Sequence, residues 1–193
     1  MRTTFFTTAH TLDTVSYIQD PYELELLEQC LKDDRKAQRA LYDKYKDAMY
    51  TRLYRMLGDE EQAADALQEA FVDIFRKLSS YEKRSSLGAW IKIIVIRKGL
   101  ARQKKKPLFF DTLDNVPDDD QKIEWDENLT GEYLEKGIRQ LPDGYRNVFL
   151  LTEVEGYTHR EAAELMNISE GTSKSQLFKA KKLLRVKLKE LMS

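Results

Sequence analysis

The sequence predicts an all-α protein built from two small helical domains that an acidic linker joins. Apolar residues recur with helical period from Asp20 to Pro107 and again from Leu129 to the C-terminus. No stretch of useful length alternates apolar and polar residues as a strand does. Residues 108–128 carry eight acidic side chains against one lysine and show no apolar period, which is typical of a linker.

Composition narrows the classes of protein that fit. The chain has 193 residues, enough for one large core or two modest ones. Its net charge of -1 would argue against nucleic acid only if the charge were evenly spread, and here the charge is segregated. Cys30 is the single cysteine, which rules out an intrachain disulfide and favours a reducing, cytoplasmic compartment. We expect no metal or cofactor and no membrane insertion, because neither zinc-ligand spacing nor an 18-residue apolar run occurs.

The first domain, residues 20–107, follows an extension over residues 1–19 that we expect to be disordered or loosely packed. A first helix is expected over Pro21–Leu31, with the proline in the first turn, where its missing N–H costs nothing. A second is expected over Arg35–Leu57. Gly58 then ends it, since glycine readily takes the left-handed conformation that stops a helix.

Two more helices complete this domain. Asp59 caps the third helix, with Gln62 three residues on in capping-box spacing, and the helix runs to Leu78. The fourth begins near Ser86 and carries an apolar run over residues 90–96 before it ends in the basic stretch ARQKKKP.

The second domain, residues 129–193, is expected to end in two helices joined by a tight turn. A preceding helix opens at Leu141-Pro142 and closes at Gly156. Thr158 and Glu161 then form a capping box, Asn167 ends that short helix, and Ser169 caps the last one.

The last helix predicts a nucleic-acid contact. Its core side carries Ser173, Leu177, Ala180, Leu184, Leu188 and Leu191. The other sides carry hydrogen-bonding groups, cations and one aromatic ring: Thr172, Lys174, Ser175, Gln176, Phe178, Lys179 and Lys182. A helix-turn-helix whose second helix bears this mixture can read base edges and hold phosphates in a major groove. The alternative is an amphipathic hairpin with a solvated lysine face.

The third helix has two stripes. Leu67, Phe71, Ile74 and Leu78 form an apolar stripe for the core. A second stripe, which we call the mixed stripe, faces away: Asp65, Gln68, Glu69, Val72 and Arg76. Such a surface can dock a protein that offers arginines, since charge-assisted hydrogen bonds orient the contact. An ordinary exposed face is the alternative.

The fourth helix and its loop combine aromatic rings with cations. The rings are Tyr81 and Trp90, and the cations are Lys83, Arg84, Lys92, Arg97, Lys98, Arg102 and Lys104, Lys105 and Lys106. Rings beside a basic track suit single-stranded DNA, because bases stack on the rings while cations hold the backbone. Taken alone, Trp90 is more often a core residue.

Two blocks of the chain resemble bacterial RNA polymerase sigma factors. ALYDKYKDAMYTRLYRMLGDEEQAADALQEAFVDIFRKL, together with residues 85–97, resembles their region 2. GIRQLPDGYRNVFLLTEVEGYTHREAAELMNISEGTSKSQLFKAKKLLR resembles region 4. No room is left for a region 3 domain, so the chain is similar to the extracytoplasmic-function group. This resemblance implies a factor, not an enzyme, that directs core polymerase to promoters and melts promoter DNA.

The resemblance also implies roles for matching residues. The mixed stripe falls where the family binds the β′ clamp helices of core polymerase. The minus-ten strand is expected on Tyr81, Lys83, Arg84, Ser85, Ser86, Trp90, Arg97 and Arg102. The minus-thirty-five duplex is expected on the last-helix residues from Thr172 to Lys182 named above. An anti-sigma partner and core β subunit contacts are further implications. The acidic linker matches a family segment that threads toward the active centre, and a solvated tether is the equally simple account.

The chain departs from the family at four positions. Leu87 and Gly88 stand where the family usually has an aromatic and a larger residue, and Arg97 stands in place of an asparagine. These changes predict less stacking and more backbone grip on the minus-ten strand. Ser173 replaces a common valine on the buried stripe, which costs roughly 1 kcal/mol or less if its hydroxyl bonds to the preceding turn.

Two other classes stay open on the residues alone. A freestanding helix-turn-helix regulator would bind a two-fold operator tightly without polymerase. A pure interaction module, such as a sequestering protein, would show no dependence on DNA. Catalysis is the least supported class, because the sequence has no phosphate loop, nucleophile elbow or metal-ligand spacing.

Overall fold

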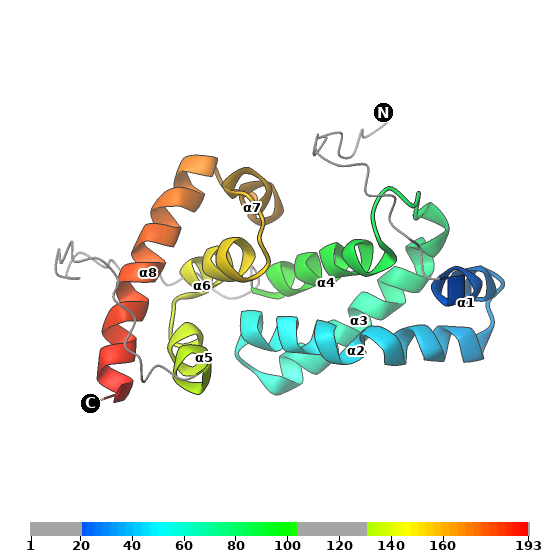
Figure 1. Cartoon of the computed structure of the whole chain (residues 1–193), viewed down its shortest axis with the longest axis horizontal. Coiled ribbons are helices and arrows are strands. Elements are labelled where there is room, and N and C mark those ends of the chain that lie inside the picture. Colours follow the sequence, from blue (N-terminus) through cyan, green and yellow to red (C-terminus); the bar gives the residue numbers. More distant parts are fainter. Residues whose placement is uncertain (1–20, 104–130, 193) are drawn as a thin grey trace.

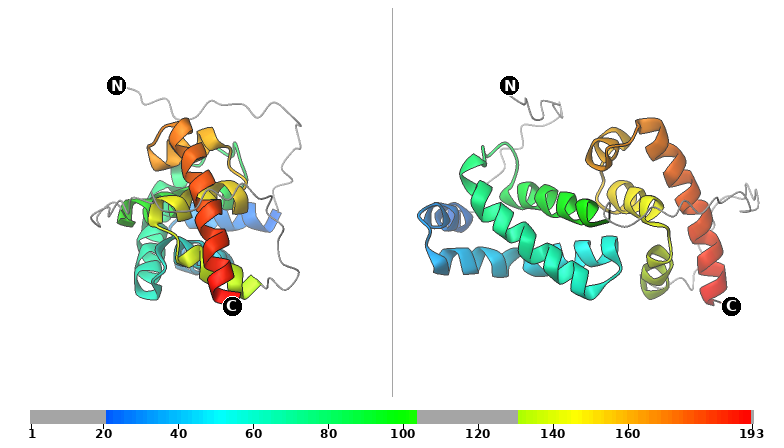
Figure 2. Two further views of the ribbon diagram at one scale, coloured as in Figure 1. Left: turned by 90° about the vertical axis from the view of Figure 1, so that its left-hand side faces the viewer. Right: turned by 180° about the vertical axis from the view of Figure 1, so that it is seen from behind.

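The computed structural model describes residues 21–103 and 131–192, and this part of the chain is helical throughout, with no strand (Figure 1). Helices α1 to α4 form one body and helices α5 to α8 a second, and the two lie side by side in the right-hand view of Figure 2. The predicted all-α fold is therefore confirmed. The expected extension over residues 1–19 and the acidic linker over residues 108–128 lie outside the described residues.

Helices α1 (Pro21–Leu31) and α2 (Arg35–Leu57) begin and end where the sequence predicts. The carboxylate of Asp34 caps α2 by accepting hydrogen bonds from the backbone N–H groups two and three residues on, at 2.7 and 3.0 Å. These two bonds hold the pKa of the Asp34 carboxyl below its ordinary value. Gly58 ends α2 with φ 69°, a conformation that carries no Cβ penalty only in glycine.

Helix α3 (Glu60–Lys77) continues into the one-turn segment η1 (Leu78–Ser80), and α4 (Leu87–Gln103) returns beside it. The predicted caps are present. Asp59 accepts a hydrogen bond from the backbone of the residue three positions on at 2.8 Å, and the hydroxyl of Ser86 does the same at 3.2 Å. Polar side chains thus fix both helix starts.

The first body has a tightly closed core. The apolar run of α4 supplies Ile91, Val95 and Ile96, which are at most 1% exposed, against Leu53 of α2 and Ile74 of α3. Helix α4 contacts both α2 and α3, so apolar residues are needed on two of its sides. This packing explains the apolar run in its sequence.

Cys30 is part of the same core and is 3% exposed. Burial, and to a smaller extent the nearby Asp34 carboxylate, raise the pKa of its thiol to about 11. The thiol is therefore a packed apolar group at neutral pH.

The second body begins with α5 (Gly131–Arg139) and α6 (Asp143–Phe149), and α6 passes directly into the π-helical segment η2 (Leu150–Val154). Pro142 precedes α6, as predicted, and Gly156 follows the π turn with φ 77°. The helix predicted between these two residues is present, but its last turn is widened. A π turn holds one extra residue, and so it changes which side chains face outward beyond it.

Helices α7 (His159–Met166) and α8 (Glu170–Met192) form the predicted helix-turn-helix. Thr158 and Glu161 make the reciprocal capping box, and Asn167 takes the left-handed conformation at φ 57°. The hydroxyl of Ser169 accepts a hydrogen bond from the backbone of the residue three positions on at 3.0 Å, which caps α8.

Helix α8 is the longest helix of the second body, and it contacts α5, α6 and α7. Its predicted core stripe is buried from Ser173 to Leu188, with Leu184 only 1% exposed. Helix α5 approaches α8 closely at Gly137, where an added Cβ would lie 2.8 Å from a methyl group of Leu184. A side chain at this position has no room.

The two bodies meet where the C-terminal ends of α2 and α4 lie against α5, α6 and the turn that follows η2 (Figure 1). The interface joins residues that are 44 to 103 positions apart in the sequence. Its contacts are mainly polar, as the next subsection describes.

Candidate functional site

The mixed stripe of α3 faces solvent along its whole length. Asp65, Gln68, Glu69, Val72 and Arg76 are all exposed, and Val72 is 47% exposed although it is aliphatic. The apolar stripe on the other side of the helix is buried, as predicted. The structure thus brings all five residues together on one accessible surface.

A groove between α2 and α3 borders the mixed stripe. Gln68 and Val72 line it from α3, with Phe71 and Phe75 beneath them. The wall on α2 is Arg35, Gln38, Arg39 and Tyr42. The sequence interpretation missed this wall, although its spacing of three and four residues is the helical period that identified the stripe on α3.

The acids of the mixed stripe are paired with cations of α4. The guanidinium of Arg102 lies 2.6 Å from the carboxylate of Glu69 and 3.5 Å from that of Asp65. The bond to Glu69 is the main cause that raises the pKa of Arg102. Lys98 lies 2.6 Å from Asp73 and 3.7 Å from Glu69, and it holds the pKa of Asp73 below its ordinary value. Arg102 therefore lies beside the mixed stripe, apart from the loop residues with which the sequence groups it.

The loop before α4 presents its cations to solvent. Lys83 and Arg84 are exposed, and Lys83 has φ 57°, an uncommon conformation for a residue with a Cβ. The hydroxyl of Tyr81 donates a hydrogen bond to the carbonyl oxygen of Ser85 at 2.5 Å and closes the loop. Lys104, Lys105 and Lys106 lie outside the described residues.

The two predicted rings lie together at the start of α4. The ring centroids of Tyr81 and Trp90 are 5.5 Å apart and tilted by 46°. Both side chains are half-buried, so each retains an exposed edge. Arg97 is exposed two turns further along α4. The arrangement provides rings and cations along one segment, as the sequence predicts for a strand-binding surface.

The departures at Leu87 and Gly88 have a structural explanation. Leu87 is 2% exposed and belongs to the core. A Cβ at Gly88 would lie 3.0 Å from the ring of Tyr45 on α2, so this ring takes the space of a larger side chain. Tyr45 in turn donates a hydrogen bond to the carboxylate of Glu23. The sequence interpretation missed Tyr45 because Gly88, beside which its ring packs, is 43 positions away in the sequence.

Helix α8 presents most of its predicted duplex-facing residues to solvent. Lys174, Ser175, Phe178 and Lys179 are exposed, and Phe178 is 60% exposed although it is aromatic. Thr172 and Lys182 are half-buried. An exposed ring between two lysines on the second helix of a helix-turn-helix is a surface that suits base edges and phosphates.

Gln176 differs from its neighbours on α8. Its side-chain amide lies against Gly144 of α6, where an added Cβ would be 3.4 Å from the amide nitrogen. Its amide oxygen is buried without a hydrogen bond. Gln176 therefore packs between α6 and α8, whereas the sequence places it with the residues that face duplex DNA.

Ser173 is fully buried at the crossing of α7 and α8. Its hydroxyl oxygen lies 2.9 Å from Nδ1 of His159, the first residue of α7. The expected hydrogen bond for this hydroxyl is thus present, but it reaches across to the neighbouring helix.

A buried polar network joins the two bodies. The carbonyl oxygen of Met56, near the end of α2, accepts hydrogen bonds from Arg146 of α6 at 3.0 Å and from Gln103 of α4 at 2.5 Å. Asn147 donates to the amide oxygen of Gln103 at 2.5 Å. All three donors are less than 9% exposed. Residues of both bodies therefore satisfy a carbonyl group that the last turn of a helix leaves unpaired.

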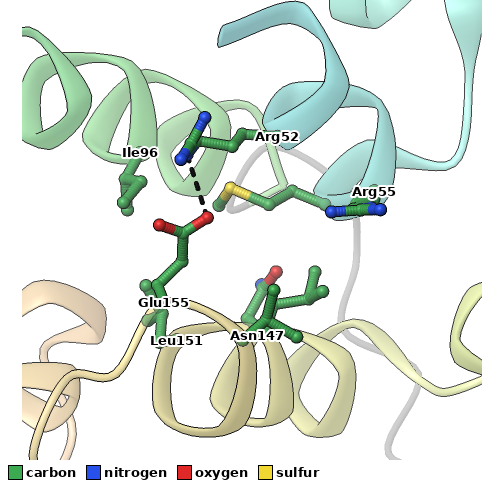
Figure 3. A pocket seen from close by; sticks show the side chains of 9 residues that line it. Arg52, Arg55, Ile96, Asn147, Leu151 and Glu155 are labelled. Atoms are coloured by element: carbon green, nitrogen blue, oxygen red, sulfur yellow. Dashed lines mark ion pairs between the residues drawn. The ribbon is translucent and has the colours of Figure 1, made fainter. Parts of the chain in front are cut away.

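A second set of contacts is ionic and lies around Glu155, beyond η2 (Figure 3). One carboxylate oxygen is 2.9 Å from Nε of Arg52 on α2, and the other is 3.2 Å from Nζ of Lys92 on α4. The ammonium of Lys92 also lies 5.2 Å from the centre of the Tyr157 ring. Burial is the main cause that raises the pKa of Tyr157 to about 12.

Two further pairs flank this centre. Arg55 donates a hydrogen bond to Glu135 of α5 at 2.6 Å. Arg139 donates one to the hydroxyl of Tyr54 at 2.7 Å, and its guanidinium lies 5.6 Å from the centre of that ring. None of these cross-body contacts was predicted from sequence.

Residues 21–103 and 131–192 contain no group of three or more histidine, cysteine, aspartate or glutamate side chains placed to hold a metal ion. Within the same ranges, every helix is too short or too polar to cross a bilayer.

Two family models match the chain. Residues 41–106 match sigma-70 region 2, and residues 131–184 match sigma-70 region 4. The chain is 31% identical to the ECF RNA polymerase sigma factor SigM of Bacillus subtilis over 155 residues, 75% of this chain and 91% of SigM. It is 28% identical to SigW of the same organism over 182 residues, 86% of this chain and 96% of SigW.

A solved structure of similar fold is the sigma factor RpoE of Bartonella quintana, crystallised in complex with the anti-sigma factor NepR. The two chains are 21% identical, with a TM-score of 0.54, and the match covers 78% of this chain and 96% of the other. This comparison supports the arrangement of helices.

Proposed function

The chain belongs to the ECF RNA polymerase sigma factors, and from this premise we propose which of its surfaces grips the enzyme and which grip the promoter. As a member of that family it is a transcription initiation factor that directs polymerase to promoters, and it is not an enzyme. We assign residues 20–107 to a region 2 domain, residues 129–193 to a region 4 domain and residues 108–128 to the linker. The observation that carries the proposal is the exposed face of α8, where a ring and two lysines surround Ser175.

Core polymerase binds the mixed stripe of α3. Val72 supplies exposed apolar surface at the centre of the stripe, and charged residues lie at both ends. This is the composition of a protein interface with an apolar centre and a polar rim. The groove beside it, with Arg39 and Tyr42 on its far wall, receives side chains of the β′ clamp helices.

The loop before α4 and the start of α4 capture the minus-ten strand. Base unpairing costs a few kcal/mol, and stacking on rings returns about 1 to 3 kcal/mol for each base. Tyr81 and Trp90 provide this platform, while Lys83, Arg84 and Arg97 hold the backbone. Ser85 and Ser86 shape the loop through their hydrogen bonds.

Helix α8 holds the minus-thirty-five duplex. Lys174 and Lys179 contact phosphates, and Ser175 and Phe178 face the bases. Thr172 and Lys182 flank this face, and Gln176 supports it from between α6 and α8. The chain works in the cytoplasm, where core polymerase is found. An anti-sigma protein restrains it, as the RpoE complex with NepR illustrates for that factor.

Transcription with purified components tests this assignment. Core polymerase with the wild-type chain initiates RNA synthesis at a cognate promoter, and Lys179→Glu abolishes initiation while circular dichroism shows an unchanged fold. The matched control is Lys189→Glu on the same helix, exposed and near its C-terminal end, which retains initiation. Equal losses in the two variants would refute the role of the α8 face, and a wild-type chain that does not bind core polymerase would refute the function itself.

A further inference from the structure

Arg52 and Lys92 come from different helices and converge on one carboxylate. Arg52 lies in the C-terminal third of α2, and Glu155 lies in the turn beyond η2 (Figure 3). Lys92 lies in α4. Each oxygen of the Glu155 carboxylate faces one cation, at 2.9 and 3.2 Å. The side chains of Arg52, Lys92 and Glu155 are 29%, 23% and 13% exposed, so solvent screens these charges less than it screens a surface pair.

The two cations belong to the first body, and the carboxylate belongs to the second. The pair of cations is therefore a fixed feature of the α2 and α4 packing, whereas the anion arrives from another part of the chain. The geometry fits a group that offers two negatively charged oxygens. A phosphodiester has two such oxygens, and Arg and Lys are its usual protein partners.

The carboxylate fits the site incompletely. Nε of Arg52 is buried and makes no hydrogen bond, although a carboxylate oxygen of Glu155 lies only 2.9 Å away. The charge of Arg52 is thus compensated while its donor is left unsatisfied, which costs free energy in a buried position. Another anion can meet this donor more favourably.

The position of the site relates it to the strand-binding segment. Lys92 lies two residues after Trp90, and both belong to the α4 segment that we assign to strand capture. The sequence groups Lys92 with the basic track, but it gives no role to Arg52.

We propose that Arg52 and Lys92 form a phosphate-binding pair for the captured promoter strand, and that Glu155 occupies this pair in the free chain. This inference rests on the proposed function, because it takes the strand from that assignment. The phosphate and the carboxylate compete for the same two cations. Strand binding at this pair therefore separates Glu155 from α2 and α4, and the free chain binds a strand less tightly than its cations allow.

A mutant cycle on the full-length chain tests the competition. The probe is a fluorescein-labelled oligothymidylate of about 15 nucleotides, a length that one strand-binding domain can cover, and its anisotropy reports binding. Glu155→Gln removes the competing charge but keeps the shape of the side chain, and we expect it to tighten binding about fivefold, the effect of losing one or two partly screened ion pairs. Arg52→Gln and Lys92→Gln each weaken binding. In the chain that carries both of these changes, Glu155→Gln gives no gain.

Glu153→Gln is the matched control. Glu153 lies two residues away and pairs with Lys181 of its own body at 2.9 Å, so its removal changes the net charge equally and also releases one lysine. A gain equal to that of Glu155→Gln would overturn the proposal, because the effect would then be one of general charge. A gain that persists without Arg52 and Lys92 would overturn it as well.

A polyglutamate peptide distinguishes the ligand class. If Glu155→Gln strengthened binding of the peptide and not of the oligothymidylate, the pair would be a site for an acidic protein segment and the proposal would fail. Transcription by the wild-type chain with core polymerase, run in parallel, tests the proposed function separately. Wild-type initiation together with no effect of Glu155→Gln on strand binding would leave the function intact and refute only the phosphate site.

Discussion

Nδ1 of His159 lies 2.9 Å from the hydroxyl oxygen of Ser173, and this contact joins the start of α7 to the first turns of α8. Ser173 is fully buried, so its hydroxyl depends on the histidine for a side-chain partner. The helix whose exposed face we assign to duplex DNA is thus oriented partly by a hydrogen bond on its opposite side.

Removal of the imidazole tests this contact. His159→Ala is expected to lower the free energy of unfolding by about 1 to 2 kcal/mol, because it leaves a buried hydroxyl unsatisfied. In a chain that already carries Ser173→Val, the same change should cost much less, since no buried hydroxyl is left behind. Urea denaturation of the four proteins measures the difference. An equal cost of His159→Ala in both backgrounds would show that the hydrogen bond contributes nothing.

The guanidinium of Arg146 donates hydrogen bonds to the first body and also to carbonyl groups of the second body, to which Arg146 belongs. It donates to the carbonyl oxygens of Met56, Arg139 and Leu141 at 3.0 to 3.2 Å, while burial lowers its pKa and Asp143 partly offsets that effect. Arg146→Met should lower the free energy of unfolding by about 2 to 3 kcal/mol, because these carbonyl groups lose charge-assisted hydrogen bonds.

Arg160→Met provides the comparison for Arg146. The side chain of Arg160 is 66% exposed and pairs with Glu164 at 3.4 Å, so its loss should cost under about 1 kcal/mol. Denaturant titration of both variants measures the two costs. Similar values would contradict the structural role given to Arg146.

Two glycines predict opposite responses to the same substitution. A Cβ at Gly137 would lie 2.8 Å from Leu184, which is itself buried, so Gly137→Ala should destabilise the chain by about 1 kcal/mol after the gain in helix propensity is counted. At Gly171, in the first turn of α8, an added Cβ would lie 3.8 Å from the hydroxyl oxygen of Ser169, and Gly171→Ala should stabilise by about 0.5 to 1 kcal/mol. Melting temperatures distinguish the two. A rise for both variants would mean that α5 and α8 are less closely packed than described.

The raised pKa of Tyr157 predicts that the folded chain loses stability at alkaline pH. Its folded-state pKa of about 12 lies above the ordinary value of 10, so the folded chain holds the phenolic proton more tightly than the unfolded chain does. This stabilising contribution is complete below pH 10 and disappears as the pH rises through 12. Tyr157→Phe lacks the titrating group, so the stability of the wild type should fall relative to that of the variant over this range.

Unfolding measured at several pH values between 9 and 12 checks the prediction for Tyr157. Tyr22→Phe is the control, because Tyr22 is 59% exposed in the folded chain. If the two variants diverged from the wild type equally, burial of Tyr157 would not be the cause.

Helix boundaries were predictable because local chemistry sets them. Gly58 and Asn167 take left-handed conformations where the sequence places helix ends, and Thr158 with Glu161 forms the expected capping box. The mixed stripe was predictable for the same reason, since the period of one helix determines which residues share a face. That core polymerase binds this stripe is our proposal.

Contacts between segments that are far apart in the sequence could not be predicted in this way. The hydrogen bond from Arg146 to Met56 spans 90 positions, and nothing in either neighbourhood marks the pairing. The inward turn of Gln176 depends on the absence of a side chain at Gly144, which only the packed α6 and α8 reveal. The π turn of η2 likewise follows from the packing around it, and it contributes to where Glu155 is presented.

Burial of the single cysteine gives the chain a practical advantage for spectroscopy. A thiol whose pKa is raised to about 11 is almost entirely protonated at neutral pH and reacts slowly with maleimides. A cysteine introduced at an exposed position, such as one replacing Glu61 on α3 or Lys189 on α8, would therefore be labelled first. A pair of dyes at those two positions would report, by energy transfer, how far α3 and α8 move apart when DNA or polymerase is added.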